Sequence, residues 1–158
     1  MRSTEELNIL VRALAWNDAF GCYTRPGMEK MLWPEISQAA EWIIYFDVDD
    51  MHEINKDHQG YDYADSIIKN VLAITRETDY TAGQWKSGDE FLIVLTKNAT
   101  RPTLDPVGMV TRLQDEFIKW GMSATFALVP VISLDLSENV QPAIDEVYKQ
   151  KDHNKRGR

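Results

Sequence analysis

The sequence predicts a single α+β domain, in which helices cover one face of a mostly antiparallel sheet. Apolar runs typical of strands and amphipathic stretches typical of helices follow one another as strand, helix, strand, strand, helix, strand, helix. Two of these strands are joined by the short polar segment 87–90 (SGDE), which is typical of a hairpin loop. The chain has 158 residues and no internal repeat or low-complexity stretch, so one well-packed core is expected.

Two helices are expected before the first long strand. The first spans residues 4–16, because Ser3 and Glu6 have the spacing of a capping box at its start. Its apolar stripe consists of Leu7, Leu10, Val11 and Leu14. Residues 17–25 are expected to form a turn, and a second helix runs over 26–38, with a proline at its first position.

The remaining elements follow from the two-residue alternation of strands and the three-to-four-residue apolar spacing of helices. Strands are expected at residues 42–46, 80–86, 91–95 and 122–131. Helices are expected at residues 51–57, 62–77, 105–120 and 140–151. We therefore divide the chain into an N-terminal helix or linker, residues 1–16, and a domain, residues 17–158.

The composition limits the classes of function. The formal net charge is -8 at pH 7, which argues against a protein that wraps DNA by bulk electrostatics but not against a protein that binds a nucleotide. Cys22 is the single cysteine, so no disulfide forms within the chain and a reducing compartment is expected. No apolar run has the length of a membrane span and no signal peptide opens the sequence, so we expect a cytoplasmic protein.

Two acidic clusters stand at the ends of predicted strands. Asp47 directly follows the strand 42–46, and Asp89 and Glu90 lie on the predicted hairpin. If the hairpin lies beside the first strand, these carboxylates converge, and converging carboxylates repel unless a cation lies between them. Mg²⁺ (or Mn²⁺) prefers oxygen ligands, and Gly88 would let the backbone approach a ligand closely. The alternative is that the segment is only a polar hairpin turn.

Several segments resemble the motifs of one family, in that family's order. Residues 87–91 (SGDEF) resemble the signature of the GGDEF domains, the diguanylate cyclases, with serine in place of the first glycine. Residues 17–25 (NDAFGCYTR) resemble the motif D-x-L-T-G-L-x-N-R, and 47–55 (DVDDMHEIN) resemble D-I-D-x-F-K-x-I-N. Residues 60–65 (GYDYAD) resemble G-H-x-x-G-D with one residue inserted before them, and 148–155 (YKQKDHNK) resemble Y-x-A-K-x-x-G-R.

This resemblance implies both a fold and a reaction. The fold is a palm like that of nucleotide cyclases and polymerases, with a central antiparallel sheet and packed helices. The reaction joins two GTP molecules into cyclic di-GMP, as the 3′-hydroxyl of each attacks the α-phosphorus of the other and pyrophosphate leaves. One domain holds one GTP, so the resemblance also implies a homodimer during catalysis.

The resemblance assigns metal and catalytic roles to the acidic residues. Asp47 and Asp89 would hold Mg²⁺ or Mn²⁺, with help from the main-chain carbonyl of Val48. Glu90 would complete the site, either by holding the metal or by assisting deprotonation of the attacking 3′-hydroxyl.

It also assigns substrate contacts. Asn55 and Asp65 would hydrogen-bond the guanine edge, whereas Lys151 and Lys155 would contact the triphosphate. His52 stands where the family has a phosphate-contacting lysine, and Gly88 would allow close approach of the substrate. The simpler interpretations are a turn cap for the asparagine and a solvated helix end for the lysines.

Departures from the family pattern keep other functions open. Ala64 stands where the base-binding motif has its second glycine, and His52 removes a charge near the phosphates. A free-standing palm-type synthase of another cyclic nucleotide, made from ATP or from a mixture, is one alternative. A catalytically silent GTP-binding switch is the other. Residues 76–79 (RETD) have the letters of the family's inhibitory product site, R-x-x-D, but lie seven residues before the signature instead of five, so no feedback inhibition is expected there.

Overall fold

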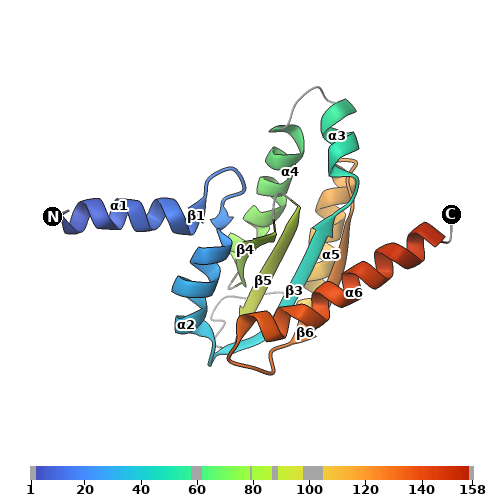
Figure 1. The fold of residues 1–158 in the computed structure, drawn as a ribbon. Coiled ribbons are helices and arrows are strands. Elements are labelled where there is room, and N and C mark those ends of the chain that lie inside the picture. The colour runs from blue at the N-terminus through green and yellow to red at the C-terminus, as the bar shows by residue number, and fades with distance from the viewer. Residues whose placement is uncertain (1–2, 58–61, 79, 87–88, 98–104, 157–158) are drawn as a thin grey trace.

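The computed structural model describes residues 3–57, 62–78, 80–86, 89–97 and 105–156. A six-stranded sheet with the order β1-β2-β4-β5-β3-β6 forms its centre (Figure 1). The strands are β1 (Trp16–Asn17), β2 (Cys22–Tyr23), β3 (Ala40–Val48), β4 (Tyr80–Lys86), β5 (Glu90–Thr96) and β6 (Ala124–Pro130). Every neighbouring pair is antiparallel except β2 and β4, so the predicted mostly antiparallel sheet is confirmed.

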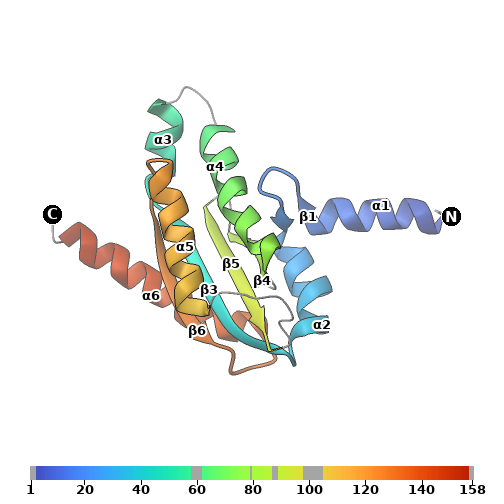
Figure 2. The ribbon, with the colours of Figure 1, turned by 180° about the vertical axis from the view of Figure 1, so that it is seen from behind.

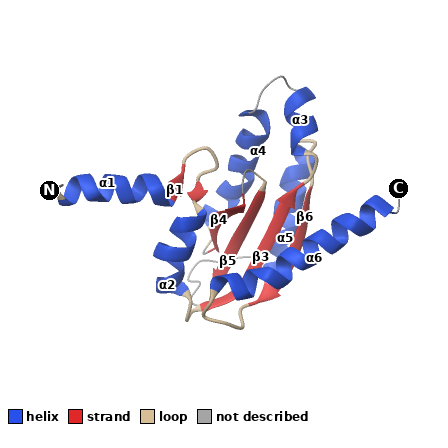
Figure 3. Cartoon of the chain, viewed as in Figure 1, coloured by secondary structure: helices blue, strands red, loops and turns tan. Residues whose placement is uncertain are grey.

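Helices pack on both faces of this sheet, which corrects the expectation that they cover one face (Figures 1 and 2). The helical segments are α1 (Thr4–Ala15), η1 (Gly27–Leu32), α2 (Trp33–Ile36), α3 (Met51–Asp57), α4 (Asp62–Ala73), η2 (Ile74–Glu77), α5 (Pro106–Lys119) and α6 (Leu136–Arg156). The helices α4 and α5 cover one face, and α2 and α6 cover the other (Figure 3). None of these helices is long and apolar enough to cross a membrane.

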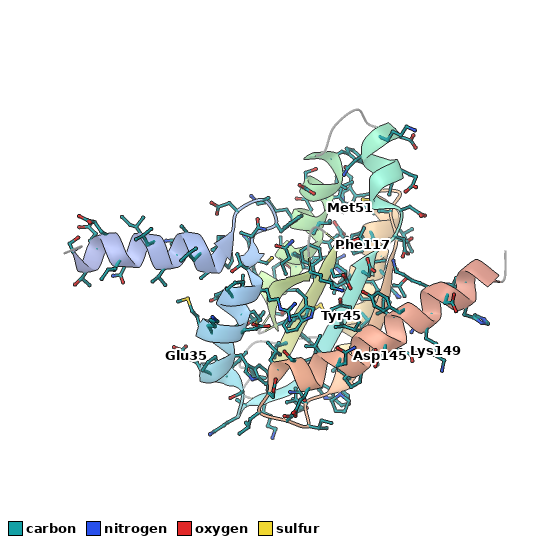
Figure 4. The ribbon with its side chains drawn as sticks, in the orientation of Figure 1. Glu35, Tyr45, Met51, Phe117, Asp145 and Lys149 are labelled. Atoms are coloured by element: carbon teal, nitrogen blue, oxygen red, sulfur yellow. The ribbon has the colours of Figure 1, made fainter. Side chains whose placement is uncertain are left out.

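The central strand β3 is buried on both faces, because successive side chains point to opposite sides. Phe46 points toward α4 and α5 and stacks on Phe91, with the ring centroids 5.3 Å apart. Tyr45 points the other way, into the apolar cluster under α6 that includes Val147 (Figure 4). A helix layer on only one side would leave one of these two faces of β3 in water.

The N-terminal helix is the predicted one, and it extends away from the sheet (Figure 1). The Ser3 hydroxyl caps it by accepting a hydrogen bond from the Glu6 N–H at 3.1 Å. Its apolar stripe is exposed, with 49% of Leu7 and 71% of Leu14 accessible. The stripe therefore contributes little to the core of this chain.

Several boundaries differ from the predictions. The strand expected at 42–46 extends two residues further at each end, so β3 includes Asp47. The predicted turn 17–25 contains the short strand β2 and part of β1, and the second helix begins with a π-helical segment. The last helix begins at Leu136 instead of residue 140 and continues to Arg156. Its early start is stabilised by Asp135, whose carboxylate accepts from the Ser137 N–H at 3.0 Å.

Candidate active site

The acidic ends of β3 and β5 lie side by side. The antiparallel register pairs Asp47 with Glu90. One residue further, the Val48 N–H donates to the main-chain oxygen of Asp89 at 2.8 Å. The two acidic clusters of the sequence therefore meet at one end of the sheet, as their strand-end positions predicted.

The helix α6 crosses this end of the sheet and adds a cation and a hydroxyl to the acids. The Lys151 ammonium lies 2.9 Å from Oδ1 of Asp49 and 3.4 Å from Oδ2 of Asp47. One turn earlier on the same helix, the Tyr148 hydroxyl donates to Oε1 of Glu90 at 3.2 Å. The same glutamate oxygen accepts from the hydroxyl of Tyr45 on β3.

Burial and mutual repulsion shift the proton affinities of two of the acids. Burial raises the pKa of Asp47 to about 6, with further contributions from the charges of Asp89 and Glu90 and an opposing one from Lys151. Burial, followed by the charge of Glu90, also raises the pKa of Asp89. Two carboxyls with raised pKa values in one place indicate a site that favours an added positive charge.

The pKa of Asp49 is lowered, whereas those of Asp47 and Asp89 are raised. Burial acts to raise its pKa, but hydrogen bonds from Lys151, Ser123 and Thr125 outweigh it, so the pKa lies below its usual range. The two hydroxyls donate to the carboxylate at 2.8 and 2.9 Å. The next residue, Asp50, has a φ of 53°, a left-handed conformation that aspartate tolerates better than most residues, and α3 begins directly after it.

The oxygen ligands at this end of the sheet suit a divalent cation. Oδ1 of Asp47 is buried and has no hydrogen-bond partner among the described residues. Asp89, Glu90 and the Val48 carbonyl supply the other metal ligands that the resemblance implied. In the part of the chain that the structure describes, no group of three or more His, Cys, Asp or Glu side chains is arranged to hold a metal ion. A partial set of oxygens fits Mg²⁺, which usually keeps positions for water and phosphate oxygens.

Comparisons with known proteins identify the fold. No family model and no curated protein matches the sequence. The coiled coil and GGDEF domain of DgcB from Caulobacter crescentus, in complex with c-di-GMP, has a TM-score of 0.71 and 12% identity, over 94% of this chain and 86% of that one. A microbial GGDEF domain, studied with cyclic di-GMP, has a TM-score of 0.67 and 17% identity, over 90% and 93%. The chain has the GGDEF-domain fold.

A further match is the diguanylate cyclase SiaD from Pseudomonas aeruginosa, in complex with its activator SiaC. It has a TM-score of 0.69 and 18% identity, over 94% of this chain and 63% of that one. At these identities the likeness establishes the GGDEF fold, whereas the chemistry has to be argued from the side chains of this chain.

The predicted base-binding residues lie on α3 and α4 of the GGDEF fold. Asn55 is 9% exposed, and its side-chain oxygen accepts from the Ala64 N–H at 3.0 Å. It therefore ties the two helices together, as the turn-cap interpretation predicts. Asp65 is the residue after Ala64 on α4, and it is half-buried. A contact of either side chain with a base stays a prediction.

Several predicted positions fall outside the described residues. Gly88 and Asp79 belong to them, as do the side chains of His52 and Lys155. Their predicted roles in this GGDEF fold therefore stay predictions. Arg76, the other half of the R-x-x-D segment, donates from Nη2 to the main-chain oxygen of Gly21 at 3.0 Å.

Sequence reasoning missed Tyr45 and Tyr148 as neighbours of the acidic site, and it left Asp49 without an assigned role. One signal was present for Tyr45, because a tyrosine in the middle of a buried apolar strand needs a partner for its hydroxyl. The partner itself could not be read from the sequence, since Glu90 lies 45 residues away.

Proposed function

We propose that this protein is a diguanylate cyclase, which condenses two GTP molecules into cyclic di-GMP. One observation carries the proposal: Asp47 keeps a buried oxygen without a hydrogen-bond donor among the described residues, beside Asp89 at the joined ends of two strands. Such an oxygen is costly to bury unless a cation contacts it. The SGDEF segment and the GGDEF fold support the same reaction.

In this proposal Asp47, Asp89 and the Val48 carbonyl hold a divalent cation, with Glu90 beside them. When bound, Mg²⁺ neutralises phosphate charge and lowers the pKa of the attacking hydroxyl. The 3′-oxygen of each GTP forms a bond to the α-phosphorus of the other, the bond to pyrophosphate breaks, and the hydroxyl protons pass to solvent. The carboxylates position the reacting groups, and positioning together with electrostatic stabilisation supplies most of the acceleration in such a reaction.

Lys151 has two positions in this proposal. In the structure its ammonium lies on Asp47 and Asp49, where it neutralises part of the acidic charge. When a cation and a triphosphate enter, the flexible side chain turns from the carboxylates to the phosphate oxygens, as the sequence predicted for it. Lys155 acts from the following turn of α6, and Asn55 and Asp65 contact the base.

The product has two-fold symmetry, so the reaction requires two domains that face each other with one GTP each. We therefore propose a homodimer that forms during catalysis. The rate per domain is expected to rise with protein concentration until dimerisation is complete.

Two sequence features favour a second candidate, a palm-type synthase that makes another cyclic nucleotide from ATP or from a mixture of ATP and GTP. His52 replaces a phosphate-contacting lysine, and Ala64 replaces a glycine of the base-binding motif. Ala64 is fully buried, so its methyl group belongs to the packing between α4 and the sheet. A changed packing at this point alters the pocket for the base.

The test incubates the purified protein with labelled GTP, with ATP and with the mixture, each with Mg²⁺. Cyclic di-GMP from GTP supports the proposal, and a product that contains adenine supports the second candidate. Tight GTP binding without turnover indicates a silent switch. Asp89→Ala is expected to abolish synthesis, whereas Asp145→Ala, which removes an exposed carboxylate from α6, leaves it unchanged (Figure 4). Full synthesis by Asp89→Ala would rule out the proposed site.

A further inference from the structure

Tyr45 is a polar residue in an apolar environment. It lies on the central strand β3, has no exposed surface and pairs in register with Leu92 and Ala127. The apolar cluster around it also contains Val147 of α6. A hydroxyl buried in such a place is costly unless it is hydrogen-bonded. The apolar ring alone would be supplied equally well by phenylalanine, so the hydroxyl needs an explanation.

The hydroxyl of Tyr45 donates a hydrogen bond to Oε1 of Glu90, and the hydroxyl of Tyr148 donates to the same oxygen at 3.2 Å. One donor comes from the sheet and the other from α6. Glu90 is itself only 6% exposed. Two donors on one oxygen fix the plane of the carboxylate and restrict its rotation.

We propose that Tyr45 is a positioning residue for Glu90: together with Tyr148 it occupies Oε1, so that Glu90 acts in the site through Oε2 alone. This inference rests on the proposed cyclase function. The sequence left two roles open for Glu90, and the inference limits either role to a single carboxylate oxygen. A carboxylate with one occupied oxygen offers a single ligand or a single proton acceptor. It does not act as a bidentate ligand.

The first test is kinetic and uses Tyr45→Phe, which keeps the ring and removes the hydroxyl. We expect kcat for cyclic di-GMP synthesis to fall about 10-fold or more, with the KM for GTP within about 3-fold, because loss of an orienting partner typically has this size. Tyr148→Phe, which removes the longer hydrogen bond, is expected to have a smaller effect. Tyr80→Phe is the matched control, since Tyr80 is also buried but lies in the opposite core.

A merely structural role is excluded by a double-mutant cycle. If Tyr45 acts through Glu90, Tyr45→Phe adds nothing once Glu90→Gln is present. Equal kcat values for Tyr45→Phe and Tyr80→Phe would overturn the inference, as would independent, additive effects of Tyr45→Phe and Glu90→Gln.

The second test does not depend on activity. The buried hydroxyl proton of Tyr45 is shielded from solvent, so proton NMR is expected to show a slowly exchanging resonance downfield of the amides. This resonance should be lost in Tyr45→Phe, shift in Glu90→Gln and stay in Tyr80→Phe. A wild-type spectrum without it, or a resonance unmoved by Glu90→Gln, would overturn the inference. If the wild type makes no cyclic dinucleotide, the proposed function fails and this spectrum still decides the role of Tyr45.

Discussion

The ammonium of Lys151 lies 2.9 Å from the carboxylate of Asp49 and also contacts Asp47. The lysine therefore occupies the region where the proposed metal would be held. Its own pKa reflects this: burial acts to lower it, but the hydrogen bond and charge of Asp49 and the charge of Asp47 raise it overall. The side chain stays charged and acts as a tethered cation.

Removal of this tethered cation is expected to strengthen metal binding. We expect Lys151→Met to bind Mn²⁺, in the absence of nucleotide, about 10-fold more tightly than the wild type, because the metal no longer shares the Asp47 carboxylate with a positive charge. Titration followed by electron paramagnetic resonance measures the free Mn²⁺ directly. Lys149→Met is the control, because Lys149 is exposed on the outer side of the same helix (Figure 4). Equal or weaker Mn²⁺ binding by Lys151→Met would contradict this prediction.

Asp47→Asn is expected to stabilise the metal-free protein while it abolishes synthesis. The folded protein holds the proton of Asp47 up to about pH 6, whereas the unfolded chain releases it near the ordinary value of 3.8. The contribution of this group to stability is therefore complete below about pH 4 and is lost as the pH rises through 6. At pH 8 we expect Asp47→Asn to raise the free energy of unfolding by roughly 1–2 kcal/mol.

Urea denaturation between pH 4 and 8, with a chelator present, measures this effect. Asp145→Asn removes one exposed carboxylate and should leave the free energy of unfolding within about 0.5 kcal/mol of the wild type. A free energy of unfolding of Asp47→Asn below that of the wild type at pH 8 would show that burial of the charged Asp47 does not destabilise the protein.

Gly21→Ala is expected to cost more stability than Gly121→Ala. Both glycines have positive φ values, 66° and 75°, so each substitution loses roughly 1 kcal/mol from the left-handed conformation alone. A methyl group at Gly21 would also displace the guanidinium of Arg76 from its hydrogen bond to the Gly21 main-chain oxygen, whereas no described atom lies within 4 Å of one at Gly121. We expect a total loss of roughly 2 kcal/mol or more at Gly21. Equal losses in thermal unfolding would mean that Arg76 moves aside freely.

Cys22 is expected to react very slowly with thiol reagents in the folded protein. It is 1% exposed, and burial raises the pKa of its thiol to about 12. Because the thiolate is the reactive form, we expect DTNB at pH 8 to react roughly 100-fold more slowly with the native protein than with the protein in 6 M guanidinium chloride. A rate that is the same in both states would place the thiol at the surface.

Local sequence patterns were sufficient for most of the elements. The hairpin of β4 and β5, the helix α5 and the strand β6 depend on side-chain periodicity and turn residues within a few positions, and they lie close to their predicted bounds. The sheet contacts of β2 could not be predicted, since a strand of two residues carries no periodic signal. The continuous apolar run of β3 is itself typical of burial on both faces. The second helix layer was missed because the identity of the helices that cover each face depends on contacts between distant segments.

The sequence by itself determined that two acidic clusters stand at strand ends, because this depends on residue type and order, and its motifs predicted the palm fold through their resemblance to the GGDEF domains. Only the tertiary structure decided that Lys151 lies on Asp47 and Asp49, and that Tyr45 and Tyr148 share one oxygen of Glu90. The physical reason is the packing of α6. Its apolar side chains pack against residues of the sheet that are distant in the sequence, and this packing fixes the rotation of the helix about its axis. The fixed rotation brings residues 148 and 151 to the acids.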